Sequence, residues 1–397
     1  MEILRKKKRG YFLLILIFLI LLVYSFQDIQ TSRNLGADRG VSRLGVYLSL
    51  FSLITILGVY FLSLLTQQIL LNKKLSVSPV QSSLVIISLW ILFVNIFQRT
   101  NIWVSAVHFG LCTLWFLLYN FFSNYLRRNP NAFKSVKKII FLMFIFYVFS
   151  AIFASHLLRD KFGRIVAVNL SYHVLVFLPW LFMMELKIRR LAMALVILVL
   201  LFSMKRGAIL VFPLMLVASI LIETKIKREK TKPPFKIIMI IFIFLCGLFV
   251  ADSVSGGFLS ERFSPENLVS GSGRASIYLA AIENIKKETI WNLLVGGGSG
   301  YTLELLGISA HNEWLEFLIN FGLIGSILYF SLLLSLFKEM RRYVRSKSPF
   351  APGCVAAIVY ILVVGMFGQI FFAHSTIYLM AFLGAANGLR HKNCLFS

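Results

Sequence analysis

Long apolar stretches recur from one end of the chain to the other, and short segments between them hold most of the polar residues. The stretches are about 15–23 residues long, which is the length an α-helix needs to cross the hydrocarbon core of a bilayer. The pattern therefore predicts an all-α integral membrane protein with about twelve transmembrane helices. The expected spans are roughly 11–26, 45–65, 82–98, 104–122, 138–154, 165–184, 191–204, 207–222, 237–252, 315–337, 353–372 and 374–389.

The composition agrees with this pattern. Of the 397 residues, 58% are hydrophobic and 14% are charged, whereas soluble domains have about 45–50% apolar and about 25% charged residues. A soluble enzyme, a disulfide-rich secreted module and a disordered tail are excluded. The cysteines form no disulfide framework, because Cys112, Cys246 and Cys354 lie inside apolar stretches and Cys394 lies in the predicted cytoplasmic tail.

The net charge of +25 is distributed unevenly along the chain. We place the basic segment Arg5–Arg9 in the cytoplasm and let the chain alternate sides. The cytoplasmic segments then carry 28 of the 41 Lys and Arg and 5 of the 16 Asp and Glu. This asymmetry predicts that both termini are cytoplasmic and that the basic residues face membrane lipids with anionic head groups. Nucleic-acid binding is not expected, since no basic stripe interleaved with aromatic residues is present.

One predicted outer segment, residues 253–314, is much longer than the others. It separates the helices of 1–252 from those of 315–397, which end in a short tail. Loops longer than about 15 residues are usually functional or disordered. Residues Arg274–Glu288 place apolar side chains on one face, which predicts a helix on the membrane surface or over the bundle. The cluster Gly296–Gly300 predicts a tight turn with accessible backbone N–H groups.

Two arginines near this loop could bind an anion. Arg206 lies between two apolar stretches, and an Arg at membrane depth usually faces a water-filled cavity or a partner. The alternative is a turn residue whose side chain reaches the head groups. Arg274 opens the predicted loop helix, where its guanidinium and the helix N-terminus could bind phosphate oxygens, or it is a solvated loop charge. Together they would form a clamp for a pyrophosphate.

His311 is the only His in the long loop. Its unperturbed pKa of about 6.5 would let a neutral imidazole take a proton from a sugar hydroxyl near neutral pH. The alternative is an interfacial His that is hydrogen-bonded to the backbone. Glu313 and Glu316 follow, but no second His completes a zinc site, so no metal is expected. The glycine cluster lacks the Lys-Ser/Thr of a nucleotide-binding loop, so no cofactor is expected either.

Taken in order, these pieces resemble the O-antigen ligase/O-antigen polymerase superfamily of bacterial polysaccharide enzymes. The resemblance covers about 190–340, and residues 1–190 match only as generic transmembrane helices. The family often has Ser-Arg-Gly at the first motif, where this chain has a lysine before the arginine. The matching pieces are Ser203–Ala208, Gly273-Arg274, Gly296–Gly300, and His311–Glu316 followed by Phe321–Gly325.

The resemblance implies a metal-independent, inverting glycosyltransferase on a GT-C-type transmembrane scaffold, acting at the periplasmic face of the bacterial inner membrane. The implied donor is a glycan on undecaprenyl diphosphate, and the acceptor is a glycan or lipid A–core. Arg206 and Arg274 correspond to family positions that hold the diphosphate, and His311 corresponds to the position that activates the acceptor hydroxyl. A chain-length regulator is a further expected partner. The supporting residues are Lys205, Gly298, Asn312, Glu313 and Glu316.

Three classes of protein remain to be compared. The favoured one polymerises O-antigen or another surface polysaccharide, or attaches it to lipid A–core; the two activities share catalytic positions and differ in acceptor. A twelve-helix transporter or flippase of lipid-linked or small substrates would need polar residues along a central pore in both halves, but the spans carry almost no charge. A non-catalytic membrane scaffold gives no reason for Arg206, Arg274 and His311 to follow the family order.

Overall fold

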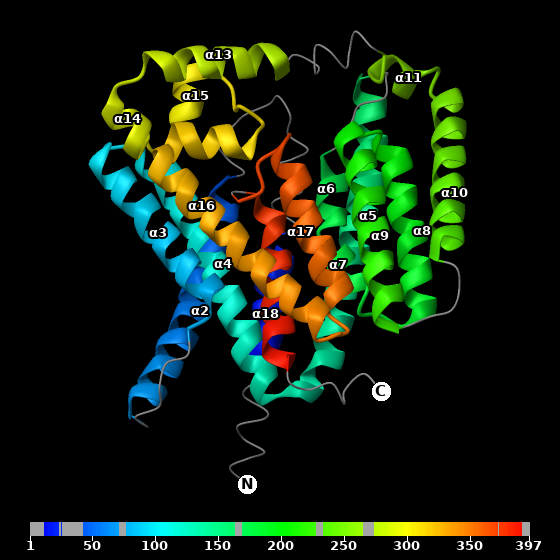
Figure 1. The fold of residues 1–397 in the computed structure, drawn as a ribbon, viewed down its shortest axis with the longest axis horizontal. Helices are drawn as coiled ribbons and strands as arrows, with labels where there is room; N and C mark the ends of the chain where they lie inside the picture. The colour runs from blue at the N-terminus through cyan, green and yellow to red at the C-terminus, as the bar shows by residue number, and fades with distance from the viewer. Residues whose placement is uncertain are drawn as a thin grey trace.

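The computed structural model describes residues 12–23, 25, 43–70, 77–162, 169–227, 233–264, 274–371 and 373–390. These ranges form helices and contain no strand (Figure 1). Six of the described helices are long and apolar enough to cross a membrane. They are α2 (Arg43–Leu70), α3 (Pro79–Phe97), α4 (Ile102–Arg128), α5 (Phe133–Phe162), α9 (Arg206–Lys227) and α16 (Glu313–Arg345).

Shorter helices overlap the remaining predicted spans, and where one span is predicted over 165–184 the structure has two short helices. Each predicted span overlaps a described helix, and the prediction of an all-α, multi-pass membrane protein is confirmed. The basic segment Arg5–Arg9, Gly273 and the tail 391–397 lie outside the described residues. The helices that overlap the remaining predicted spans are Phe12–Val23, α6 (Leu170–Leu175), α7 (Leu178–Leu181), α8 (Leu186–Ser203), α10 (Pro233–Val254), α17 (Ala351–Gly365) and α18 (Ile377–Leu389). Short 3-10 turns lie at η1 (Pro130–Ala132) and η3 (His374–Thr376).

Helices α8 and α9 are two separate elements, as the sequence predicts. The chain reverses at Met204, which has a left-handed backbone conformation (φ 47°). At the other end of the pair, Arg189 of α8 and Glu223 of α9 form an ion pair of 2.9 Å. Since Arg189 lies near the start of α8 and Glu223 near the end of α9, the two helices run antiparallel.

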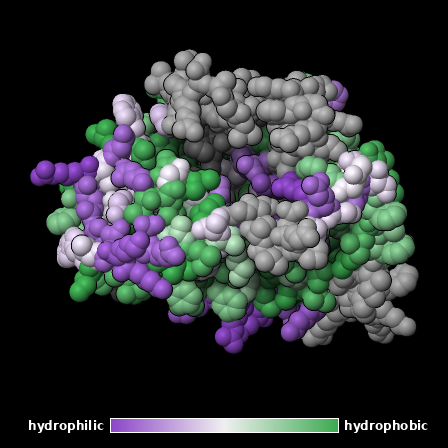
Figure 2. All heavy atoms as spheres, turned by 90° about the horizontal axis from the view of Figure 1, so that it is seen from above, coloured by the Kyte–Doolittle hydropathy of each residue, from purple (hydrophilic) through white to green (hydrophobic). Residues whose placement is uncertain are grey.

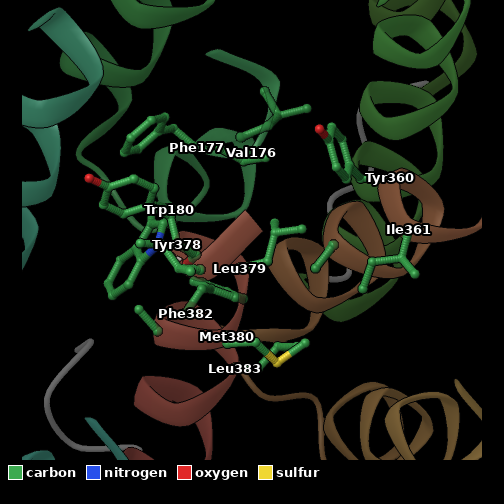
Figure 3. Packing of buried hydrophobic residues seen from close by; sticks show 14 of the residues in the cluster. Val176, Phe177, Trp180, Tyr360, Ile361, Tyr378, Leu379, Met380, Phe382 and Leu383 are labelled. Atoms are coloured by element: carbon green, nitrogen blue, oxygen red, sulfur yellow. Dashed lines mark hydrogen bonds between the residues drawn. The ribbon is translucent and has the colours of Figure 1, made fainter. Parts of the chain in front are cut away.

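The core of the bundle lies where α18 packs along α4 and α17 packs along α9. Gly384 and Gly388 allow α18 to approach α4 closely, because a Cβ atom at either position would overlap backbone oxygens of α4. Large aromatic side chains fill the space beside this contact (Figure 3). Trp180 of α7 donates a hydrogen bond of 3.0 Å to the carbonyl of Tyr378 and stacks edge-on against Phe382.

Short helices cover one end of the bundle, which is the upper end in Figure 1. Helix α13 lies across this end, as the amphipathic pattern predicts, and Ala281 on its inner face is fully buried. Below it lies the kink of α16 at Gly322 (φ 67°, ψ −173°). The short helices are α11 (Phe258–Arg262), α13 (Arg274–Lys287), α14 (Ile290–Val295) and α15 (Tyr301–Leu306).

The glycine cluster packs against this kink. Gly297 and Gly298 donate backbone hydrogen bonds of 3.0 and 2.7 Å to the carbonyls of Ile319 and Asn320. The N–H of Ser299 donates to the side chain of Asn95 at 2.9 Å. The prediction that these N–H groups are accessible is therefore wrong. They are used to join the loop to α16, because the kink leaves carbonyls of α16 without partners inside the helix.

Replacing Gly322 by alanine should destabilise the protein by about 1–3 kcal/mol. The backbone there is in a region that L-residues rarely adopt, and an added Cβ would overlap the carbonyl of Leu294. Unfolding of the detergent-solubilised protein in a denaturant series measures the change. Gly58→Ala is the matched control, because a Cβ at Gly58 of α2 meets no atom within 4 Å. Equal stability of the two variants would contradict the prediction.

Candidate active site

A cavity of about 510 Å³ lies at the upper end of the bundle. Hydrophilic residues gather in patches on this face, among hydrophobic ones (Figure 2). The cavity brings together four of the residues selected from the sequence, although they lie in three separate parts of the chain. Its walls come from α6, the start of α9, α11, α13 and the segment before α16, together with the end of α17. The four residues are Lys205, Arg206, Arg274 and His311.

Lys205 and Arg206 reach the cavity because α8 ends and α9 begins there. The left-handed Met204 breaks the helix, and the two cations follow at once. The guanidinium of Arg206 donates a hydrogen bond to the backbone carbonyl of Arg262. A Cβ atom on Gly207 would overlap the hydroxyl of Tyr172. The glycine after Arg206 therefore makes room for a tyrosine of the cavity wall.

Arg262 is a fourth cation of the cavity, and sequence reasoning missed it. It is one of four basic residues in the loop 253–314, and this position in the loop was the only signal that could have selected it. No described Asp or Glu lines the cavity, and the described ion pairs do not involve Lys205, Arg262 or Arg274. The site thus holds an excess of positive charge that an anion could neutralise.

Burial and the neighbouring cations both lower the proton affinity of basic residues in the cavity. Burial, followed by the charges of Arg274, Arg262 and Arg206, lowers the pKa of Lys205 to about 8. Burial and the charge of Arg274 also lower the pKa of Arg262. Both effects disfavour the charged form of the free protein. A bound phosphate would offset the repulsion among the cations, and the N-termini of α9 and α13 add partial positive charge at the same place.

His311 lies on the cavity wall in a short loop with a left-handed backbone conformation (φ 50°). Its N–H donates to the hydroxyl of Ser309 at 3.2 Å. The Tyr278 hydroxyl of α13 lies at hydrogen-bond distance from two carbonyls, those of His311 and Met366. Partial desolvation and the charge of Arg274 lower the pKa of His311, while Glu316 opposes the shift. This shift favours the neutral form of the ring, which is the form that can accept a proton.

Glu316 holds the loop that carries His311. One carboxylate oxygen accepts hydrogen bonds from the Ser309 hydroxyl at 2.6 Å and from the Ala310 N–H at 2.8 Å. The other accepts from the Asn320 side chain at 3.1 Å. The carboxylate is almost fully buried. It does not line the cavity, so its described contacts fix the position of His311 rather than reach a ligand.

Glu313 and Asn312 hold the opposite wall. The Glu313 carboxylate is fully buried and accepts hydrogen bonds from the N–H groups of Ile370 and Phe371 at 2.7 and 2.9 Å. Asn312 caps α16 by accepting from Trp314 at 3.0 Å, and its amide donates to the Met366 carbonyl at 3.1 Å. Both residues tie the start of α16 to the segment that follows α17.

Gly298, the remaining predicted supporting residue, does not line the cavity but lies in the turn that packs on α16. Several wall residues had not been selected from the sequence. His173 packs its ring against Tyr147, with centroids 5.8 Å apart, and also lines the cavity. No local signal marked the others: two come from apolar helices, and the third lies in the segment after α17. They are Tyr172, Tyr360 and Gln369.

The lowered pKa values of His311 and Lys205 predict a bell-shaped pH profile for a reaction in this cavity that uses both residues. A proton acceptor at His311 would be lost as the pH falls through the lowered pKa of this residue, below 6.5. One cation is lost as the pH rises past about 8, where Lys205 deprotonates. We expect kcat/KM to fall on both sides, measured from about pH 5 to pH 9. Lys205→Arg should remove the alkaline limb, because arginine stays charged. If the wild type and Lys205→Arg show the same alkaline limb, Lys205 is not the group that causes it.

Comparison with known proteins identifies the central part of the chain. A family model described as O-antigen ligase matches residues 191–330. This range contains all four cations of the cavity and His311. A comparison with curated proteins finds no match. Over residues 191–330 the chain is thus similar to O-antigen ligase, and this match supports the resemblance to the O-antigen ligase/polymerase superfamily.

Proposed function

We propose that the protein transfers a glycan from a polyprenyl diphosphate, undecaprenyl diphosphate in bacteria, to an acceptor hydroxyl at the outer face of the inner membrane. The observation that carries the proposal is the cavity with four cations and no described carboxylate. A diphosphate carries several negative charges and fits this excess. Its expected products are O-antigen or another surface polysaccharide, made by polymerisation or by ligation to lipid A–core.

The depth of the cavity supports a lipid-linked donor. Arg206 is the first residue of a membrane-spanning helix, and His311 lies two residues before another. Both side chains therefore lie near the boundary of the apolar layer, where the head group of a lipid carrier is found. The sparse charge on the outer segments and the basic segments on the other side favour the outer face for this end of the bundle.

The chemistry follows from the residues of the wall. The acceptor oxygen attacks the anomeric carbon, the bond from that carbon to the diphosphate oxygen breaks, and the diphosphate leaves with the electron pair. His311 takes the hydroxyl proton. Attack opposite to the leaving group inverts the anomeric centre. Negative charge grows on the departing oxygen, and Arg206, Arg262 and Arg274 are already placed to stabilise it. This scheme needs no metal, and we expect activity to persist in a chelator.

Analysis of lipopolysaccharide from a strain lacking the protein tests the proposal. Loss of the ladder beyond core plus one repeat unit would identify a polymerase. Complete loss of O-antigen from lipid A–core, with polymer accumulating on the carrier lipid, would identify a ligase. Wild-type complementation should restore the ladder. An unchanged ladder, with every other surface glycan also unchanged, would contradict glycosyl transfer.

A further inference from the structure

A second and larger cavity, of about 1190 Å³, lies at the other end of the bundle. Glu339, one of its wall residues, follows Glu313 on the same helix by 26 positions. At 1.5 Å per residue this is roughly 35–40 Å along α16. The second cavity is therefore distinct from the His311 cavity, and the reaction described above does not use it.

The polar wall of this cavity is basic. It includes Arg127 at the end of α4, Lys338 and Arg342 of α16, and Arg390 after α18. The described ion pairs involve none of these four side chains. The only described carboxylate in the wall is Glu339, which accepts hydrogen bonds from the hydroxyls of Tyr119 at 3.0 Å and Tyr343 at 3.2 Å. The wall thus carries an excess of three positive charges among its described residues.

Amide and hydroxyl side chains lie between the cations. Gln81 at the start of α3 donates to Asn120 of α4, and Asn387 of α18 donates to the Ser123 hydroxyl at 2.9 Å. These groups line the cavity together with Asn124. Uncharged donors beside several cations can bind the oxygens of a phosphodiester and its polar substituent.

The opposite wall is apolar and belongs chiefly to α2 and α3. Helix α2 packs chiefly against α4 and diverges from the other helices at its lower end (Figure 1). In a bilayer, an apolar wall beside this divergence would be open to the acyl chains. Such a wall suits a hydrocarbon chain and gives no affinity to a free phosphate ion. The wall residues are Phe61, Leu64, Leu65, Val85, Ile86 and Phe116.

We propose that this cavity binds an anionic glycerophospholipid. Its phosphate lies among Arg127, Lys338, Arg342 and Arg390, and an acyl chain lies against the apolar wall of α2 and α3. Basic pockets between transmembrane helices bind anionic head groups in this manner. If the His311 cavity faces outward, as the proposed function requires, the lipid comes from the cytoplasmic leaflet. The binding itself does not depend on that function.

Titration of the full-length protein in a neutral detergent with phosphatidylglycerol, followed by native mass spectrometry, tests this site. Each phosphate-binding cation contributes about fivefold to affinity. We expect Arg127→Gln and Arg342→Gln each to weaken phosphatidylglycerol binding by about fivefold, and the double variant by about 25-fold. Arg341→Gln is the matched control, because Arg341 is an exposed neighbour on α16 that does not line the cavity.

Three outcomes would overturn the proposal. Arg342→Gln and Arg341→Gln could bind phosphatidylglycerol equally, which would remove the cavity cations from the site. Phosphatidylethanolamine could bind as tightly as phosphatidylglycerol, which would exclude selection by net charge. Displacement of the lipid by millimolar inorganic phosphate would assign the cavity to a free phosphate. The assay measures lipid binding alone, so failure of the proposed glycosyl transfer would leave its result unchanged.

Discussion

His311→Ala should reduce glycan transfer by about 10²–10⁴-fold, the usual contribution of a general base. Alanine cannot take the proton of the acceptor hydroxyl, while the four cations that would bind the donor remain in place. The purified protein in nanodiscs, supplied with the lipid-linked oligosaccharide, measures the rate, and binding of the donor is measured separately. We expect the rate to fall and donor affinity to change little.

Two controls separate catalysis from folding in this experiment. His156→Ala removes an exposed histidine of α5 that does not line the cavity and should retain wild-type activity. Imidazole added to His311→Ala should restore part of the rate, because it can replace the missing proton acceptor. Full activity of His311→Ala without imidazole would remove His311 from the mechanism.

Arg274→Gln should reduce transfer by about 10²–10³-fold, which is the cost of removing one preorganised donor to a developing anion. Arg274 lines the cavity from the first residue of α13, and its charge affects both Lys205 and His311. The variant keeps a hydrogen-bond donor but loses the charge and the paired N–H groups that bind two phosphate oxygens. We expect a loss of donor affinity as well as a lower rate, in contrast to His311→Ala.

Lys286→Gln is the matched control for Arg274, because Lys286 is an exposed cation near the other end of α13. It should retain the wild-type rate. The pKa of His311 should also rise in Arg274→Gln, since a nearby positive charge that lowers it has been removed. NMR titration of labelled histidine measures that shift. Equal transfer by Arg274→Gln and Lys286→Gln would exclude Arg274 from donor binding.

The sequence was sufficient for the spans, for helix α13 and for the selection of Arg206, Arg274 and His311. Each depends on a local property. Hydropathy over about 20 residues decides whether a segment can enter the bilayer, since backbone groups in lipid must be satisfied within a helix. The amphipathic period of Arg274–Lys287 is equally local. Charge asymmetry between segments predicted an orientation by the same kind of reasoning.

Only the tertiary structure decided how the remaining groups are used. Arg262 joins the cavity because α11 packs beside the start of α9, a contact across 56 residues of sequence. Glu313 and Glu316 resemble surface carboxylates in the sequence, yet both are buried and hold backbone segments of the site. The glycine cluster resembles an open anion-binding turn, and its N–H groups instead pair with the kink of α16.

The physical reason for this division is the range of the interactions. Partition into a membrane acts on one segment at a time, so the amino-acid sequence alone was enough to predict the long apolar helices. A cavity forms where several helices end together, and its charge is the sum over side chains distant in sequence. Long-range packing therefore decided that four cations converge without a described carboxylate at one end, and that a basic, partly apolar cavity opens at the other.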